Sequence, residues 1–150
     1  MSGIYLIVWD AAEKDKSKVL RTTKGGYPHL TIAYTGDKLS NIRLKKIASG
    51  LLEKWAMQYI TLTKAVVNSF EDKPGHTRHD VLMSTNRIEE IEEAREAYLR
   101  SEYPDQNFSM HIPHVTYGIY EDKAEAEAAA EVLNKTLLPY DVIVTGVTIY

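Results

Sequence analysis

Apolar and polar positions alternate along several short segments of the chain, which predicts β-strands there. We expect strands at residues 3–9, 29–35, 59–67, 81–85, 114–120 and 140–150. Longer segments combine helix-forming residues with apolar side chains three and four positions apart, the spacing of an amphipathic helix. We expect helices at residues 38–57, 87–101 and 121–137.

Polar segments rich in turn residues separate these elements. Residues 11–26 end in a Gly-Gly pair, and we expect a helix in their first half and a loop in their second. Residues 71–80, EDKPGHTRHD, are rich in turn formers and predict a linker at the midpoint of the chain. Asn86, three residues before Glu89, resembles a capping arrangement for the helix at 87–101.

The two halves of the chain share one order: a strand, a polar segment or helix, a strand that begins with histidine, a long helix and a strand. This repeated order indicates an internal duplication. We therefore expect a single α+β domain with two lobes, at about residues 1–70 and 80–150. Two mostly antiparallel sheets, flanked by helices, would face each other across a cleft.

Composition narrows the class of protein. The 150 residues include no cysteine, so disulfides, thiolate metal ligands and cysteine nucleophiles are all excluded. The net charge of −3 disfavours binding of long duplex nucleic acid, although a small phosphate ligand can still bind in a locally basic cleft. No apolar run has the length of a membrane span. We expect a cytoplasmic protein that does not bind membranes, and we assume a monomer.

Each half contains the pattern Pro-His-apolar-Thr, at residues 28–31 and again at 113–116. On a strand, residues two apart point to the same face, so His29 shares a face with Thr31 and His114 with Thr116. The residue between them points the opposite way, into a core. Proline has no N–H donor and suits the start of a strand, where a cleft can reach the histidine.

Two histidines and two hydroxyls around one point match the needs of phosphodiester chemistry. A neutral histidine can accept a proton from the attacking hydroxyl, and a protonated histidine can donate one to the leaving oxygen. The ordinary histidine pKa, about 6.5, allows both forms near neutral pH. Threonine hydroxyls can bond to the phosphate oxygens as charge builds. A single such histidine is more often structural than catalytic, so the inference depends on the pair.

The tetrads His29-Leu30-Thr31-Ile32 and His114-Val115-Thr116-Tyr117 resemble the signature of the 2H phosphoesterase superfamily. The resemblance extends to the duplicated layout and the size of the whole chain. It implies a bilobal, pseudo-symmetric α+β fold and cleavage of phosphodiesters without a metal or other cofactor. His29 and His114 would be the general acid and base, in an order left open, and Thr31 and Thr116 would bind phosphate.

The substrate class stays open among several members of that superfamily. These include RNA 2′,3′-cyclic phosphodiesterases of the LigT type, enzymes that degrade 2′,5′-oligoadenylate, and phage anti-CBASS nucleases that open cyclic oligonucleotides. The acidic chain favours short or cyclic oligonucleotides, possible targets of a viral or phage immune-evasion enzyme acting in the host cytosol. The alternatives are the LigT-type activity and a non-catalytic module that sequesters a nucleotide.

Other residues near the tetrads are candidate substrate ligands. Tyr27 and Tyr117 flank the two tetrads and can stack on a base, although ordinary strand packing also explains tyrosines there. Lys24 and Arg21 lie in a glycine-flanked loop and can bind phosphate. His111 lies three residues before His114, at the expected mouth of the cleft.

Two weaker hypotheses concern the midpoint segment. Arg78 is a further candidate phosphate ligand. His76 and His79, together with His114, raise the question of a zinc site, but zinc usually needs three or four well-spaced ligands, often on regular elements. We therefore expect no metal site.

Overall fold

The computed structural model describes residues 3–10, 29–34, 40–96 and 112–149. In chain order its elements are β1 (Gly3–Asp10), β2 (His29–Tyr34), α1 (Asn41–Trp55), β3 (Tyr59–Lys73), β4 (His76–Thr85), α2 (Ile88–Arg95), β5 (His114–Tyr120), α3 (Lys123–Thr136) and β6 (Tyr140–Ile149). The α+β class is confirmed. The helix expected in the first half of residues 11–26 lies outside the described residues. No helix within the described ranges is long and apolar enough to cross a membrane.

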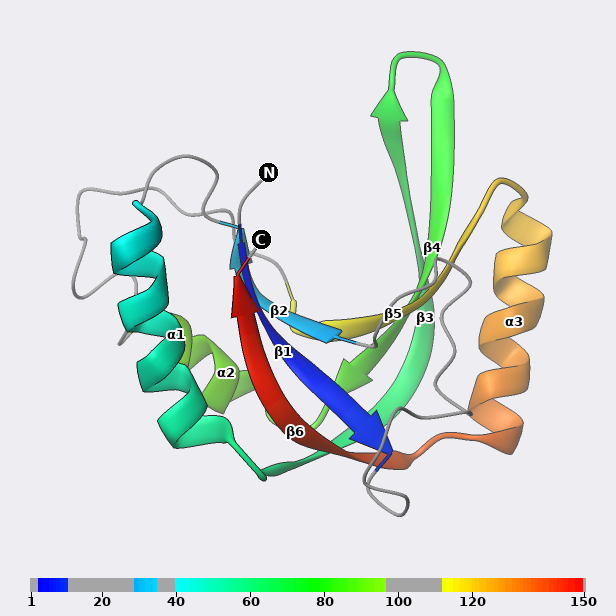
Figure 1. The fold of residues 1–150 in the computed structure, drawn as a ribbon. Coiled ribbons are helices and arrows are strands. Elements are labelled where there is room, and N and C mark those ends of the chain that lie inside the picture. The colour runs from blue at the N-terminus through cyan, green and yellow to red at the C-terminus, as the bar shows by residue number, and fades with distance from the viewer. Residues whose placement is uncertain (1–2, 11–28, 35–39, 97–111, 150) are drawn as a thin grey trace.

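The strands are hydrogen-bonded in the order β1-β2-β5-β4-β3-β6, and β6 pairs with β1 to close a barrel (Figure 1). Every neighbouring pair is antiparallel. Two junctions are short: β3 pairs with β6 only through residues 59–62, and β2 pairs with β5 only at Leu30 and Val115. The expected pair of separate sheets is therefore not confirmed, because the six strands form one closed sheet with two short junctions.

The helices cover opposite sides of this barrel (Figure 1). Helix α1 packs on β6 and α2 on β2, whereas α3 packs on β3, β4 and β5. The strands between the two short junctions thus form two groups. One group is β2-β1-β6 with α1 and α2, and the other is β3-β4-β5 with α3.

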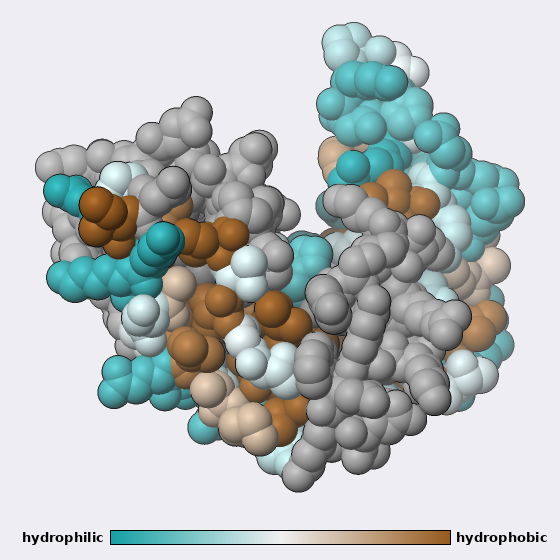
Figure 2. Space-filling model, in the orientation of Figure 1, coloured by the Kyte–Doolittle hydropathy of each residue, from teal (hydrophilic) through white to brown (hydrophobic). Residues whose placement is uncertain are grey.

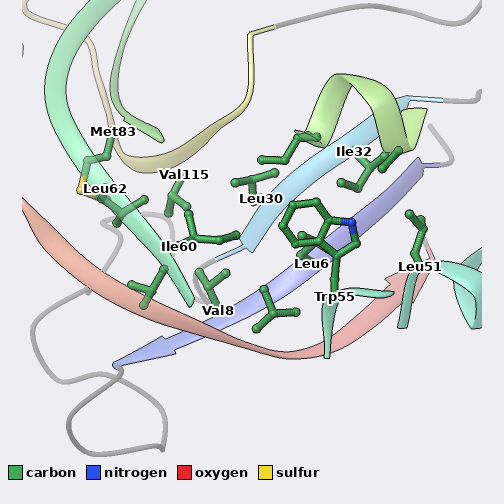
Figure 3. Close-up of a cluster of buried hydrophobic side chains, with 14 of the residues drawn as sticks. Leu6, Val8, Leu30, Ile32, Leu51, Trp55, Ile60, Leu62, Met83 and Val115 are labelled. Carbon is green, nitrogen blue, oxygen red and sulfur yellow. The ribbon is translucent and has the colours of Figure 1, made fainter. Parts of the chain in front are cut away.

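A continuous apolar core joins the two groups (Figure 3). Trp55 from α1 is 1% exposed and lies against side chains of β1 and β2. Leu30 of β2 and Val115 of β5 are completely buried. Burial of each such side chain contributes about 1.5–3 kcal/mol to folding, so the tetrad strands are anchored by the residues between the histidines and threonines.

Capping side chains set the starts of two helices. The Ser40 hydroxyl accepts a hydrogen bond from the Arg43 N–H (3.4 Å), so α1 begins at Asn41 rather than at residue 38. The Asp122 carboxylate accepts one from the Ala124 N–H (2.9 Å) at the start of α3. Both helices end within two residues of the predicted ends.

The cap expected at Asn86 is wrong. Its side-chain oxygen instead accepts a hydrogen bond from the Thr61 N–H (3.0 Å), and its own N–H donates to the Thr61 carbonyl (3.1 Å). Asn86 therefore ties the end of β4 to β3. Helix α2 begins at Ile88, and residues 97–101 of the predicted helix lie outside the described residues.

The linker expected at residues 71–80 is also wrong. Strands β3 and β4 continue through this segment and pair as far as Lys73 and His76. Only Pro74 and Gly75 form the turn, where Gly75 has φ +78, a conformation that favours glycine. The outer half of this hairpin stands away from the core (Figure 1), so its strands are polar and lack the alternation that predicts a half-buried strand.

Side chains tie this hairpin to the rest of the fold. The His76 ring bonds Asp72 Oδ1 through Nδ1 (2.5 Å) and Glu121 Oε1, just before α3, through Nε2 (2.9 Å). Nearer the core, the Asn134 amide of α3 bonds both the N–H and the carbonyl of Ala65 (2.8 and 3.0 Å). Asn134 thereby satisfies the edge of β3 beyond its junction with β6.

Candidate active site

The junction between β2 and β5 brings the two tetrads together. Leu30 is the register partner of Val115, and the strands are antiparallel. Because the two strands run in opposite directions, the next residues on either side of this pair match His29 with Thr116 and Thr31 with His114. Side chains opposite each other on one face have Cβ atoms about 4.5–5.5 Å apart, and diagonal neighbours about 7–8 Å. When this register is continued by one residue on each side, the two histidines are diagonal neighbours on one face.

A cavity of about 220 Å³ opens on this face, and we call it the histidine cavity. All four predicted catalytic residues line it: His29, Thr31, His114 and Thr116. The sequence-based expectation that the two tetrads face one site is thus met in the geometry, while the catalytic roles stay predictions. The remaining walls come from the β3–β4 hairpin and from Ile119 of β5.

The surroundings of His114 define its tautomer and its charge. Its Nδ1 lies 2.7 Å from the Ile112 carbonyl oxygen, which can only accept, so Nδ1 carries the hydrogen. In the neutral ring the lone pair is then on Nε2. Burial lowers the pKa of His114, and the charge of His29 lowers it further, outweighing the opposite effects of the Ile112 carbonyl and Asp80. His114 is therefore neutral at pH 7 and suited to accept a proton.

An ion pair forms the opposite wall of the histidine cavity. The Arg78 guanidinium donates two hydrogen bonds to Asp80, from Nε to Oδ1 (2.9 Å) and from its NH2 group to Oδ2 (3.0 Å). The guanidinium also lies 4.7 Å from the centre of the Phe70 ring. Asp80 is buried, whereas about a third of the Arg78 side chain is exposed, so the cation is fixed in place but still reachable from the cavity.

Sequence reasoning missed most of this wall. Asp80, Asn68 and Phe70 were not predicted, and Arg78 was only a weak candidate in a supposed linker. The available signal was the spacing of two along residues 78, 80 and 82, and along 68 and 70, which places each set on one face of a strand. That signal is usable only once the segment is known to be a hairpin.

Tyr117 is not brought to the cavity. Between Thr116 and Gly118 the register of β5 against β4 shifts by one residue, and Tyr117 packs against the core. Alternation from Thr116 already points Tyr117 away from the cavity, on the same face as Val115. The bulge changes the alternation only beyond Tyr117, where Ile119 rather than Gly118 lines the cavity. The other candidate substrate ligands, Tyr27, Lys24, Arg21 and His111, lie outside the described residues.

The three histidines of the zinc hypothesis are not brought together. His76 bonds Asp72 and Glu121, His79 bonds the Ser69 hydroxyl (2.6 Å between Nδ1 and Oγ), and only His114 lines the cavity. Within the described ranges, no group of three or more His, Cys, Asp or Glu side chains has an arrangement that could hold a metal ion.

No protein-family model matches this chain, and no curated protein matches it. Two histidines, two threonines and an arginine around one cavity can bind an oxyanion and move protons on both sides of it.

Proposed function

We propose that the protein is a metal-independent phosphodiesterase that cleaves short or cyclic oligonucleotides. The observation that carries the proposal is the shared cavity of His29, Thr31, His114 and Thr116. The resemblance of both tetrads to the 2H phosphoesterase signature supports it. In this proposal the groups β2-β1-β6 and β3-β4-β5 are the two lobes of such a fold. They do not coincide with the expected sequence halves at about 1–70 and 80–150, because β6 pairs with β1 and β3 pairs with β4.

The proposed reaction uses one histidine on each side of the phosphorus. Neutral His114 accepts the proton of an attacking hydroxyl, from water or a ribose, at Nε2. The oxygen forms a new bond to phosphorus while the bond from phosphorus to the leaving oxygen breaks. Protonated His29 donates its proton to that leaving oxygen. Each proton transfer of this kind contributes about 10²–10⁴-fold to the rate.

Hydroxyls and the arginine stabilise the charge on the phosphate. Thr31 is buried and Thr116 is half-buried, so their hydroxyls are held in fixed positions beside the histidines. The Arg78 guanidinium, held by Asp80, also lines the cavity and is a candidate hydrogen-bond donor to the phosphate. Groups aimed in advance at developing charge lower the barrier because they need no reorganisation during the reaction.

The cavity and the chain charge indicate the substrate size. A volume of about 220 Å³ accommodates a phosphate and part of its nucleotides rather than a duplex. The net charge of −3 also disfavours a long polyanion. Cyclic or 2′,5′-linked signalling nucleotides are therefore the favoured substrates, and RNA with a 2′,3′-cyclic phosphate end is the alternative. The proposal includes a cytoplasmic location, with which a chain lacking cysteine is compatible.

A mass-resolved digest in excess EDTA tests this function. The substrates are cyclic di- and trinucleotides, 2′,5′-linked oligoadenylate, and RNA ending in a 2′,3′-cyclic phosphate. We expect conversion of one class, and we expect His29→Ala or His114→Ala to lower kcat at least 100-fold.

His79→Ala is the matched control, since His79 lies on the same hairpin but does not line the histidine cavity. It should keep parental turnover, with circular dichroism confirming that all three variants fold. Full activity of both cavity variants would refute the site. Nucleotides that bind but return unchanged would favour a sequestering module instead.

A further inference from the structure

A second cavity adjoins the histidine cavity and has a different character. It measures about 270 Å³ and is lined by Val66, Val67, Asn68, Leu82, Ser84, Ile112 and His114; we call it the apolar cavity. Asn68, Leu82 and His114 line both cavities, so the two lie side by side. Each alone is smaller than the usual ligand pocket of about 300–1,000 Å³, but together they form a two-part site.

Exposed apolar side chains gather around these two cavities. Val66 is 42% exposed and Ile112 is 69% exposed, both at the apolar cavity, while Phe70 is 37% exposed at the histidine cavity. Single exposed apolar residues are ordinary on a soluble protein, but several around one hollow mark a binding site. Figure 2 shows apolar side chains toward the base of the projecting hairpin and polar ones toward its tip.

Besides His114, two uncharged polar side chains, Asn68 and Ser84, lie among the apolar ones that line the apolar cavity. The Ser84 hydroxyl is already engaged, because it donates to the Lys64 carbonyl (3.2 Å) and lies 3.1 Å from the Thr63 hydroxyl. The Asn68 amide makes no hydrogen bond to any other residue that the structure describes. Asn68 is the register partner of Asp80, which places it at the boundary between the two cavities.

We propose that the apolar cavity binds the nucleobase of a nucleotide whose phosphate lies between His29 and His114, and that Asn68 recognises the polar edge of that base. This inference rests on the proposed phosphodiesterase function. A nucleobase has two apolar faces and a polar edge, which matches apolar walls with one available amide. An aliphatic chain would leave the amide unpaired, at a cost in affinity.

The amide pairs with a base edge that carries an acceptor beside a donor, which adenine offers at N7 and N6 and cytosine at N3 and N4. Asparagine offers one N–H donor and one carbonyl acceptor side by side, and these pair with the N7 acceptor and the N6 amino donor of adenine. An aspartate in the same place would offer acceptors only. Asn68→Asp should therefore reduce the preference for adenine relative to guanine, which presents two adjacent donors at N1 and N2.

The test uses a set of dinucleotides that share the linkage cleaved by the parent protein. The set contains adenine, guanine, cytosine and uracil versions and an abasic version with hydrogen in place of the base. We measure kcat/KM for each. The ratio of the adenine to the abasic value should fall about tenfold in Asn68→Ala, the loss expected for one or two neutral hydrogen bonds.

Two valines provide a matched pair of variants. Val66→Ala removes part of the cavity wall and should lower the same ratio several-fold. Val132→Ala makes the same change at an exposed position on α3, 57% exposed and outside both cavities, and should leave it at the parental value.

The outcomes separate this inference from the proposed function. If the parent protein cleaves none of the linkages, the function fails. If the parent cleaves them but Asn68→Ala lowers the adenine and abasic values equally, the nucleobase subsite fails and the function stands. If Asn68→Asp keeps the parental order of bases, the assigned role of Asn68 is wrong.

Discussion

At the scale of single residues, the charge of His114 depends on three neighbours as well as on burial. Burial and the charge of His29 lower its pKa, whereas the hydrogen bond to the Ile112 carbonyl and the charge of Asp80 raise it. Asp80 also holds Arg78 by two hydrogen bonds. One carboxylate therefore both orients a cation and moderates the basicity of the proposed base.

Asp80→Asn should shift the pH dependence of turnover. As pH rises through the pKa of His114, the ring loses its proton and becomes the base, so kcat/KM should rise along an acidic limb below pH 6.5. Loss of the Asp80 charge removes an effect that raises this pKa, so the limb should move to still lower pH. A pH profile of kcat/KM measures the shift.

Glu127→Gln removes one negative charge from an exposed position on α3, outside the cavity, and serves as the control. Its acidic limb should match that of the parent. A limb that moves to higher pH in Asp80→Asn, or that does not move, would contradict the role of Asp80.

At the scale of elements, the β3–β4 hairpin is both a wall of the site and a projection from the barrel. Its residues Asn68, Phe70, Arg78 and Asp80 line the histidine cavity, yet its outer half has no core behind it. Contacts between side chains must therefore hold it in place. The bonds from His76 to Asp72 and Glu121 are the outermost of these, and they connect the hairpin to the start of α3.

Glu121→Gln should lower the pKa of His76, as measured by an NMR titration of the ring. The hydrogen bonds to Asp72 and to Glu121 raise that pKa above 6.5. The contribution of protonated His76 to stability is therefore complete below pH 6.5 and is lost as pH rises through the raised pKa. The partner Asp72 has a lowered pKa, so its contribution is lost only as pH falls below 3.8.

Because these side chains are exposed to solvent, the effect on global stability should be small. The pKa of His76 should fall less in Glu121→Gln than in Asp72→Asn, since the bond to Asp72 is the largest cause of the shift. An unchanged titration in Glu121→Gln would show that the hairpin is not attached to α3 in solution.

At the scale of the whole molecule, the two tetrads meet at the shortest junction of the barrel, between β2 and β5. Leu30 and Val115 form the single register pair between β2 and β5, and both are completely buried. The core behind this pair therefore fixes the relative positions of His29 and His114. Stability and the proposed activity would therefore depend on adjacent residues of one strand that point in opposite directions.

Leu30→Ala should reduce the free energy of unfolding by about 2–5 kcal/mol, the usual cost of a cavity left by a buried leucine. His29→Ala, one residue away, should reduce it far less, because this side chain faces the histidine cavity and is only half-buried. Urea denaturation measures both changes. A loss of stability in His29→Ala as large as that in Leu30→Ala would mean that the histidine is mainly structural.

The sequence by itself determined the local features of this protein. Spacings of two, three and four residues are properties of a single strand or helix, so they predicted most elements and the outward direction of His29 and His114. The buried partners Leu30 and Val115 followed from the same alternation. Repetition of the tetrad also indicated that the two motifs belong to one site.

Only the tertiary structure decided which other residues reach that site. A polar hairpin that stands away from the core has no apolar pattern, so Asp80 was assigned to a linker and Asn68 lay just beyond the strand predicted at 59–67. A one-residue bulge in β5 brought Ile119 to the cavity face, and hydrogen bonds to Thr61 of β3 engage Asn86 in place of the expected cap. Bulges and contacts between distant strands depend on residues far apart in the chain, whereas sequence periodicity records only neighbours.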